Sequence, residues 1–352
     1  MKTKTHQIFF DSRLKNLKFE INRSKGHLFS YINNRIRWHL FPTIHHVAKF
    51  PSHVDIELSS LCNLNCPMCY TTTDNFKAKV NQKVMNMDLF KKIIDECSKF
   101  NLYSIRLSLR GESFINKDIF KMIEYAKKKG IKEVSTLTHG GFLNEEKFEK
   151  LIDLDLDWLS ISFDGIEDTY NKIRHPLKFE DSLENIKNYQ KIKKRRGVVK
   201  PVIKVQTVWP AISKDPDRYF SLFEPITDQV ASNPLIDYLA KDSDIEYEEN
   251  FSCPQLYQRF VIGADGNVML CAFDEMESHK IGNMNNETIF DIWHGEKINK
   301  AREIHKKHLG AEQIEICKHC PLTRKRESES TNLGGKSLKI SKYVGRDQTV
   351  GK

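Results

Sequence analysis

The sequence predicts an α/β fold whose larger part is a partial (β/α)6 barrel, related to the eight-unit TIM barrel. From about residue 51 to 235, short runs rich in β-branched residues alternate with longer amphipathic segments. Repeated strand–helix units of this length imply parallel strands joined by right-handed crossovers. Six such units are too few to complete an eight-unit barrel. Periodicity alone leaves an open doubly wound sheet as the alternative.

Six segments have the pattern of strands, and five segments between them have the pattern of helices. The strand candidates are residues 53–58, 104–109, 133–138, 158–163, 202–208 and 229–233. The helix candidates are residues 88–100, 117–129, 145–153, 181–195 and 216–226. Asp88 precedes one apolar-periodic run as a start signal, and Gly130 follows another as a stop signal. In either parallel architecture, functional residues gather at the carboxyl ends of the strands.

The chain divides into four regions by composition. Residues 1–50 carry aromatic and basic residues and predict a helical extension, either packed on the barrel or shaping the substrate entrance. Residues 51–238 form the barrel, and residues 239–325 form a small C-terminal domain that combines a β-hairpin with helical segments. Residues 326–352 are polar and rich in Ser, Gly and Lys, which predicts a disordered basic tail.

Composition favours a soluble, cytoplasmic protein. No run in the 352 residues approaches the length of about eighteen apolar residues that a membrane span needs. Residues 1–50 lack the apolar core and cleavage site of a secretory signal. Because disulfides are rare in the cytosol, the eight cysteines are expected to be reduced and to serve as metal ligands.

The net charge of +9 raises nucleic acid or a membrane surface as a partner. The basic residues are spread through helical stretches such as residues 127–129 and 191–196, where a solvated outer face explains them. A nucleic-acid module also needs a recognised fold or aromatics interleaved with the basic residues. We therefore expect no nucleic acid and no membrane among the partners.

Cys62, Cys66 and Cys69 follow the first predicted strand, with three and then two residues between them. A 4Fe-4S cluster needs one ligand per iron, so three clustered thiolates leave one iron open to a small molecule. The alternative is a zinc knuckle or a group of buried thiols. Zinc sites prefer four N/S ligands in pairs, which three clustered cysteines fit poorly.

This spacing, with the strand before it, resembles the signature of the radical S-adenosylmethionine (radical SAM) superfamily. The resemblance implies that SAM chelates the open iron and that an electron from the reduced cluster cleaves it to a 5′-deoxyadenosyl radical. It also implies a partial barrel, a contact of Met68 with SAM, and an external reductant such as flavodoxin or ferredoxin.

Further motifs behind the later strands resemble SAM-binding motifs of the same superfamily. Gly111 and Glu112 resemble the Gly-Gly-Glu motif that meets the SAM amino group, with Arg110 in place of its first glycine. A carboxylate beside a ligated ammonium accepts a charge-assisted hydrogen bond. Thr138 and His139 resemble the Thr-Asn-Gly motif, with His139 in the Asn position. Each motif is weak alone, and their order behind the cysteines makes the set specific.

Two strands and a helix supply the remaining candidates. Ser162 and Asp164 lie two residues apart near the end of the fourth predicted strand and resemble a Ser-x-Asp-Gly stretch near the SAM ribose and carboxylate. Gln206 on the fifth strand is another predicted SAM contact. Arg174 resembles a recurrent arginine that binds a SAM carboxylate or the substrate, the alternative being an exposed helix arginine. His175 and His139 are predicted proton carriers because imidazole titrates near neutrality.

A second constellation consists of Cys253, Cys271, Cys317 and Cys320. Residues 264–267 have the composition of a hairpin turn between residues 260–262 and 268–270, which brings Cys253 and Cys271 to the base of one hairpin. Four thiolates hold either zinc or a fully ligated 4Fe-4S cluster, and spacing does not decide between them. The segment resembles the accessory domain called SPASM, or its shortened form Twitch. Residues 321–352 contain no cysteine, so the resemblance implies one auxiliary 4Fe-4S cluster.

The eighth cysteine, Cys97, lies in an amphipathic run and is predicted to be a core thiol, with a hydrogen-atom donor as the alternative. Taken together, the resemblance implies a radical SAM oxidoreductase or epimerase that acts on a small sugar or cyclitol. Modification of a ribosomally made peptide is the second reading. A non-catalytic iron-sulfur electron-transfer protein is an alternative of another class, supported by the departures at Arg110 and His139.

Overall fold

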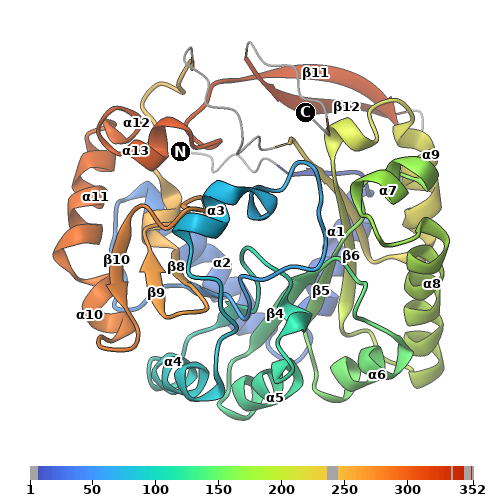
Figure 1. Ribbon diagram of the computed structural model, residues 1–352, viewed down its shortest axis with the longest axis horizontal. Coiled ribbons are helices and arrows are strands. Elements are labelled where there is room, and N and C mark those ends of the chain that lie inside the picture. Colours follow the sequence, from blue (N-terminus) through green and yellow to red (C-terminus); the bar gives the residue numbers. More distant parts are fainter. Residues whose placement is uncertain (1–6, 236–244, 334–335, 345–349, 351–352) are drawn as a thin grey trace.

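The computed structural model describes residues 7–235, 245–333, 336–344 and 350. A mixed ten-stranded sheet with the order β1-β7-β6-β5-β4-β3-β2-β8-β9-β10 curves through the molecule, and a two-stranded sheet joins β11 and β12 (Figure 1). The strands of the large sheet are β1 (Ile8–Phe9), β2 (His53–Ile56), β3 (Ser104–Arg106), β4 (Glu133–Thr138), β5 (Trp158–Ser162), β6 (Val202–Val208), β7 (Gln229–Asn233), β8 (Arg259–Ile262), β9 (Asn267–Met269) and β10 (Lys280–Asn283).

Strands β2 to β7 are parallel, as predicted, and occupy the six positions expected from the sequence. Two features extend the predicted sheet. Strand β8 of the C-terminal hairpin pairs parallel with β2, and β1 pairs antiparallel with β7. Figure 1 shows the result as an incomplete barrel with helices on its outside. The partial barrel is therefore confirmed, and the small C-terminal domain continues its sheet.

Thirteen α-helices lie within the described residues. They are α1 (Arg13–Arg23), α2 (Leu28–Thr43), α3 (Asp74–Lys79), α4 (Met87–Lys99), α5 (Ile119–Lys128), α6 (Glu145–Asp153), α7 (Glu167–Ile173), α8 (Phe179–Arg196), α9 (Pro216–Phe223), α10 (Ile289–Trp293), α11 (Glu296–Lys306), α12 (Gly310–Gln313) and α13 (Glu315–Lys318). In α4, the Asn86 side chain caps the first turn, and Phe90, Ile93, Ile94 and Cys97 are fully buried on one face. Cys97 is thus a core thiol.

Alternation along the strands separates an apolar outer face from a polar inner one. Val54, Ile105 and Val205 belong to the core packed under the helices. On the opposite side of the same strands, the buried Asp55 forms an ion pair at 2.9 Å with the half-buried Arg106. Because side chains alternate along a strand, the inside of this barrel is lined by polar groups. The described residues contain no helix long and apolar enough to cross a membrane.

Helices α1 and α2 cover the amino ends of the barrel strands. Arg23 at the end of α1 bonds Glu133, the first residue of β4, at 3.0 Å. His27 lies 3.3 Å from Asp157, which directly precedes β5. The Asn34 side chain donates to the carbonyl of Ser52, just before β2. The N-terminal extension therefore packs on the end of the barrel opposite to the strand ends that carry the sequence motifs.

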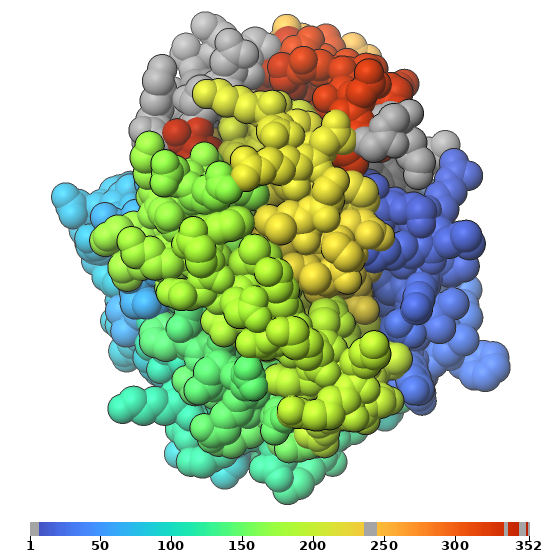
Figure 2. All heavy atoms as spheres, turned by 90° about the vertical axis from the view of Figure 1, so that its right-hand side faces the viewer, coloured from blue at the N-terminus to red at the C-terminus, as the bar shows by residue number. Residues whose placement is uncertain are grey.

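The predicted disorder of the C-terminal tail is wrong for much of its length. Strands β11 (Arg326–Leu333) and β12 (Lys336–Tyr343) pair antiparallel and cross the top of the molecule in Figure 1. Leu333, Ile340 and Tyr343 are at most 3% exposed, so a few apolar side chains anchor an otherwise polar hairpin. Composition averaged over the tail conceals this alternation. Figure 2 shows the C-terminal atoms capping the top of the face formed by α8 and α9.

Candidate active site

The three cysteines of the first motif lie in the loop after β2, at the carboxyl end of the barrel. Cys62 is exposed, Cys69 is half-buried and Cys66 is buried. Desolvation, together with the neighbouring Glu112, Cys69 and Cys66, raises the pKa of Cys62 to about 11. The Cys62 thiol therefore carries a proton near neutral pH until a metal ion replaces it. The three side chains therefore lie within electrostatic reach of one another at one edge of the sheet.

Gly111 packs directly against the start of this loop. A β-carbon at residue 111 would lie 2.4 Å from the carbonyl oxygen of Leu61 and 2.5 Å from that of Ser59. The next amide, Glu112 N–H, donates to the Leu61 carbonyl at 2.8 Å. Only glycine fits this close approach of two backbones. The glycine of the second motif thus positions the segment that leads into Cys62.

Arg110, the departure from the family motif, turns away from the cysteine loop and bridges two domains. Its guanidinium donates to Glu57 at 2.6 Å and to Glu277 at 2.8 Å. Glu57 follows β2, whereas Glu277 lies between β9 and β10 of the C-terminal domain. All three side chains are at most 2% exposed. The arginine therefore joins the barrel to the C-terminal domain and leaves the close contact of Gly111 with the cysteine loop unobstructed.

The Glu112 carboxylate connects the loops after β3 and β4. It accepts hydrogen bonds from Thr138 Oγ1 at 2.8 Å, from the His139 amide at 2.9 Å and from the Phe114 amide at 3.1 Å. Burial raises the pKa of Glu112, and these three bonds oppose that shift. Glu112, Thr138 and His139 are thus brought together, as their order along the chain predicted.

His139 holds the cysteine loop and is unsuited to carrying protons near neutrality. Its Nδ1 accepts from the Gly141 amide at 3.0 Å, so Nε2 carries the hydrogen and donates to Asn63 Oδ1 at 2.8 Å. Burial, and then the positive charge of Arg174, lower the pKa of His139 to about 3. A pKa in this range argues against proton transfer by His139 near neutrality, and the proton-carrier interpretation stays a prediction. Sequence reasoning also missed Asn63, which lies between Cys62 and Cys66 and has no motif of its own.

On the other side of the site, Arg174 lies beside both Asp164 and Cys66. Its Nε donates to Asp164 Oδ2 at 2.9 Å, and its Nη1 lies 3.8 Å from Cys66 Sγ. Asp164 Oδ1 in turn accepts from the Val208 amide at the end of β6. The arginine is therefore held by a buried partner next to the cysteine loop. His175, by contrast, is exposed at the end of α7 and is not drawn into this group.

The remaining predicted SAM contacts lie on β5, on β6 and in the cysteine loop. Ser162 on β5 and Gln206 on β6 are partners in register, and Ser162 is 8% exposed. Gln206 and Met68 are half-buried.

The four remaining motif cysteines gather in the C-terminal domain. Cys253 precedes β8, Cys271 follows β9, Cys317 lies in α13 and Cys320 follows it. Burial raises the pKa of Cys253 to about 11 and that of Cys320 to about 12. The pKa of Cys271 is raised by burial and then by each of the other three thiols, which shows how close they lie.

Comparison with known families decides what these two groups of cysteines belong to. The family model of the radical SAM superfamily matches residues 56–208. The model of SPASM, an iron-sulfur cluster-binding domain, matches residues 253–321. The chain therefore contains a radical SAM domain followed by a SPASM domain. Its two domains indicate a SAM-binding 4Fe-4S cluster and an auxiliary iron-sulfur cluster.

Several proteins resemble this radical SAM chain in sequence. A tungsten-containing aldehyde ferredoxin oxidoreductase cofactor-modifying protein from Pyrococcus furiosus is 25% identical over 261 residues, which cover 71% of each chain. A probable GTP 3',8-cyclase from Methanococcus maripaludis is 32% identical over 119 residues, 34% of this chain and 38% of its own length. The match to the cyclase therefore covers well under half of either protein.

Solved structures show the same fold at low sequence identity. BtrN in complex with AdoMet and 2-DOIA has a TM-score of 0.51 at 19% identity, and covers 77% of this chain and 92% of its own. The native protein anSMEcpe with bound AdoMet has a TM-score of 0.56 at 16% identity, with coverage of 76% and 86%. Streptococcus suis SuiB bound to precursor peptide SuiA has a TM-score of 0.52 at 15% identity, with coverage of 84% and 75%.

The donor sets of the radical SAM chain fit the two clusters. Three thiols lie at the barrel edge and four in the SPASM domain, and Gly111 leaves room for the first loop. Among the described residues, no three His, Cys, Asp or Glu side chains are close enough together to bind one metal ion. The ligands of a cubane cluster bind different irons and stand further apart.

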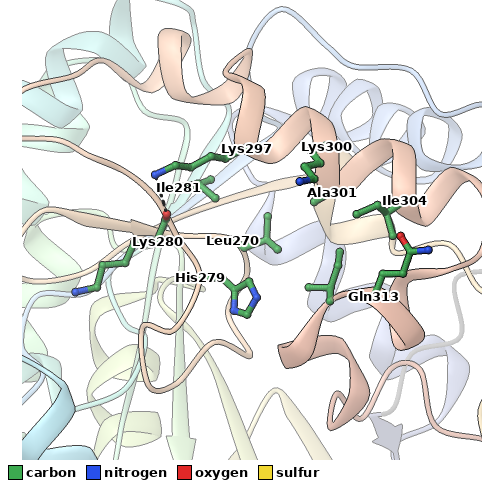
Figure 3. A pocket seen from close by; sticks show the side chains of 10 residues that line it. Leu270, His279, Lys280, Ile281, Lys297, Lys300, Ala301, Ile304 and Gln313 are labelled. Atoms are coloured by element: carbon green, nitrogen blue, oxygen red, sulfur yellow. Dashed lines mark hydrogen bonds between the residues drawn. The ribbon is translucent and has the colours of Figure 1, made fainter.

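A pocket of about 300 Å³ lies in the SPASM domain, away from the barrel motifs. Figure 3 shows Leu270, His279 and Ile281 on one side and Lys300, Ala301 and Ile304 of α11 on the other. It shares no residue with the motifs at the barrel edge. The pocket is therefore separate from the candidate SAM site.

Proposed function

We propose that this protein reductively cleaves SAM at a cluster held by Cys62, Cys66 and Cys69, and removes a hydrogen atom from a small sugar-like or cyclitol-like substrate. The outcome is oxidation or epimerisation. The supporting observation is that loops after β2, β3, β4 and β5 are tied into one site by two buried networks. One network joins Glu112 to His139, and the other joins Arg174 to Asp164.

Each residue at this site has a task that its contacts support. Arg174 places a positive charge beside Cys66 and presents donors for a carboxylate, which suits the methionine end of SAM. Glu112 offers oxygens to an ammonium group, and Thr138 fixes their orientation. Met68, Ser162 and Gln206 supply the remaining contacts. When bound, the cluster and SAM supply the radical chemistry, while the protein positions both reactants and excludes water.

The polar inner face of the barrel supports a small hydrophilic substrate. Ser160, Ser162, Lys204 and Gln206 share one side of β5 and β6, directly below the motif loops. An apolar substrate would leave such groups without partners, which costs free energy. The solved complex of BtrN, whose title names 2-DOIA beside AdoMet, shows that this fold accommodates a small second ligand in a related protein.

Peptide modification remains a second candidate function. SuiB bound to its precursor peptide covers 84% of this chain, more than the small-molecule complex of BtrN does. A peptide would enter from the open side of the barrel. In that case, activity would depend on a genetically linked precursor peptide and not on a polyol.

Product analysis tests the proposal. Reduced, cluster-loaded protein should convert SAM to 5′-deoxyadenosine, and a panel of deuterated polyols and sugars should transfer deuterium to that product. The Cys62→Ala, Cys66→Ala, Cys69→Ala triple variant is the control and should form no 5′-deoxyadenosine. If the wild type also forms none while its clusters are intact, the enzymatic proposal fails. If it forms the product but no polyol or sugar transfers deuterium, the small-substrate proposal fails.

A further inference from the structure

We propose that Lys204 and Ser160 form an anion-binding subsite inside the barrel, so that the substrate carries a carboxylate or phosphate group. The substrate class follows only if the proposed function is correct, whereas anion binding itself does not depend on it. Lys204 lies on β6 and Ser160 is its partner in register on β5. Both side chains are buried, at 7% and 1% exposure.

The Lys204 ammonium is buried and has no ion-pair partner among the described residues. Its only hydrogen-bond partner among the described residues is Gln7 Oε1. Its Nζ also lies 5.7 Å from the centre of the Phe9 ring and 5.9 Å from that of Trp158. Within the described part of the chain, no carboxylate lies within ion-pair distance of it, although buried lysines are normally paired.

Within the described part of the chain, the cations that neighbour Lys204 have ion-pair partners, whereas Lys204 has none. Arg23 is paired with Glu133, and Arg106 is paired with Asp55. Burial and then repulsion from Arg23 lower the pKa of Lys204 to about 7, with Arg106 adding to the shift and the Glu20 carboxylate opposing it. An anion placed next to the ammonium would offset both effects. A neutral polyol would supply hydrogen bonds but no opposite charge.

Two further donors near Lys204 lack an acceptor. Ser160 Oγ and Trp158 Nε1 are buried and have no hydrogen-bond partner within the described residues. The Trp158 ring lies near Lys204, and Ser160 is on the same side of β5 as Trp158. Unpartnered buried donors of this kind are rare and need an explanation. The acceptor oxygens of a carboxylate or phosphate would satisfy all three groups.

The subsite lies deeper in the barrel than the predicted SAM contacts, by a distance that a small substrate can span. Ser162 and Gln206, the predicted SAM contacts, form the next pair in register on the same face of these two strands. Two residues of a strand advance about 6.6 Å towards the carboxyl end. The Lys204 side chain reaches Phe9, which pairs with Ala231 and so lies level with Gln206. An acid group here would hold the rest of a small molecule beneath the SAM position.

Anion titration of the cluster-loaded protein with SAM tests this subsite. Sodium phosphate and sodium acetate are titrated calorimetrically at constant ionic strength into wild type, Lys204→Met, Ser160→Ala and the surface control Lys121→Met, with myo-inositol as the neutral probe. Lys121 is 73% exposed and, within the described residues, forms its ion pair with Asp118. We expect wild type and Lys121→Met to bind one of the anions equally well. Lys204→Met should bind it at least tenfold more weakly, with Ser160→Ala in between.

The preferred anion distinguishes a carboxylate substrate from a phosphate ester. Both interior variants should fold, because each removes a polar group that has little compensation, and their melting temperatures without anion verify this. Equal anion binding by wild type and Lys204→Met overturns the subsite, as does binding of myo-inositol alone. The SAM-sensitive electron paramagnetic resonance signal is recorded on the same samples. If wild type shows no SAM-sensitive signal, the proposed function is refuted, but the anion-binding subsite is not.

Discussion

Replacement of His305 by Phe is expected to change the auxiliary cluster without touching the SAM site. His305 Nε2 lies 3.4 Å from Cys317 Sγ, and the ring is 1% exposed. Burial lowers the pKa of His305 to about 4, so the ring is neutral near pH 7. A metal-bound thiolate has no proton to donate, so Nε2 carries the hydrogen, and Nδ1 has no hydrogen-bond partner among the residues that the structure describes. The ring fits only because residue 310 is glycine. A β-carbon at that position would lie 2.0 Å from the imidazole.

The size of the effect follows from the strength of this hydrogen bond. Hydrogen bonds to charged groups contribute roughly 1.5–3 kcal/mol, and the bond to the more negative, reduced cluster is the stronger one. If the difference between the two oxidation states is about 1.4 kcal/mol, loss of the bond lowers a one-electron potential by about 60 mV. Hydrogen bonds to sulfur are among the factors that set iron-sulfur potentials. We therefore expect a lower potential for the auxiliary cluster in His305→Phe.

Potentiometric titration monitored by electron paramagnetic resonance measures this shift. His305→Gln keeps an N–H donor and should recover part of the potential, whereas the exposed His308→Gln is the surface control. The SAM-sensitive signal should keep its potential in all variants. An unchanged auxiliary potential in His305→Phe, with the cluster still present, would refute the role of the hydrogen bond.

Three further outcomes follow from the barrel edge. Gly111→Ala should lower the iron content of the SAM cluster selectively, because the new β-carbon meets backbone of the cysteine loop; full iron occupancy would contradict this. Arg110→Met should reduce the free energy of unfolding in urea by roughly 3–5 kcal/mol, because Glu57 and Glu277 lose their buried partner, and adding Glu57→Gln should restore part of it. His139→Asn should reduce the loss of unfolding free energy that wild type shows as the pH falls below neutrality. His139 binds a proton near pH 6.5 only when unfolded, since its folded pKa is about 3, so wild type loses stability as pH falls below 6.5. Between pH 7 and 5 this amounts to about 2 kcal/mol, and an equal loss in the variant would contradict it.

Local sequence patterns predicted the barrel well because each strand–helix unit is specified by its own residues. Helix α6 has the predicted bounds, and β4, β6 and β7 match residue for residue. Strand β2 ends two residues earlier than predicted, and the residue after it, Glu57, accepts a hydrogen bond from Arg110. The pairing of β8 with β2 joins segments some two hundred residues apart, and no local pattern specifies it.

Motif spacing predicted which residues form the candidate site, but not their protonation states or their interaction partners. The order of motifs along the chain was enough to bring Glu112, Thr138 and His139 together. The neutral state of His139 depends on its burial and on Arg174, which lies far away in the sequence. Lys204 and His305 carry no motif, and only the structure shows the partners that each has or lacks. Long-range burial, which periodicity does not encode, accounts for these differences.

The central claim, a SAM-binding cluster on Cys62, Cys66 and Cys69 beside an auxiliary cluster, is tested most directly by anaerobic iron and sulfide analysis combined with electron paramagnetic resonance. Wild type and the triple alanine variant of these cysteines are reduced and compared with and without SAM. We predict about eight irons per chain in wild type and about four in the variant, from one cubane at each group of thiols. The variant should also lose a signal that SAM perturbs in wild type. Equal iron content in both proteins, or a wild-type signal insensitive to SAM, would contradict the claim.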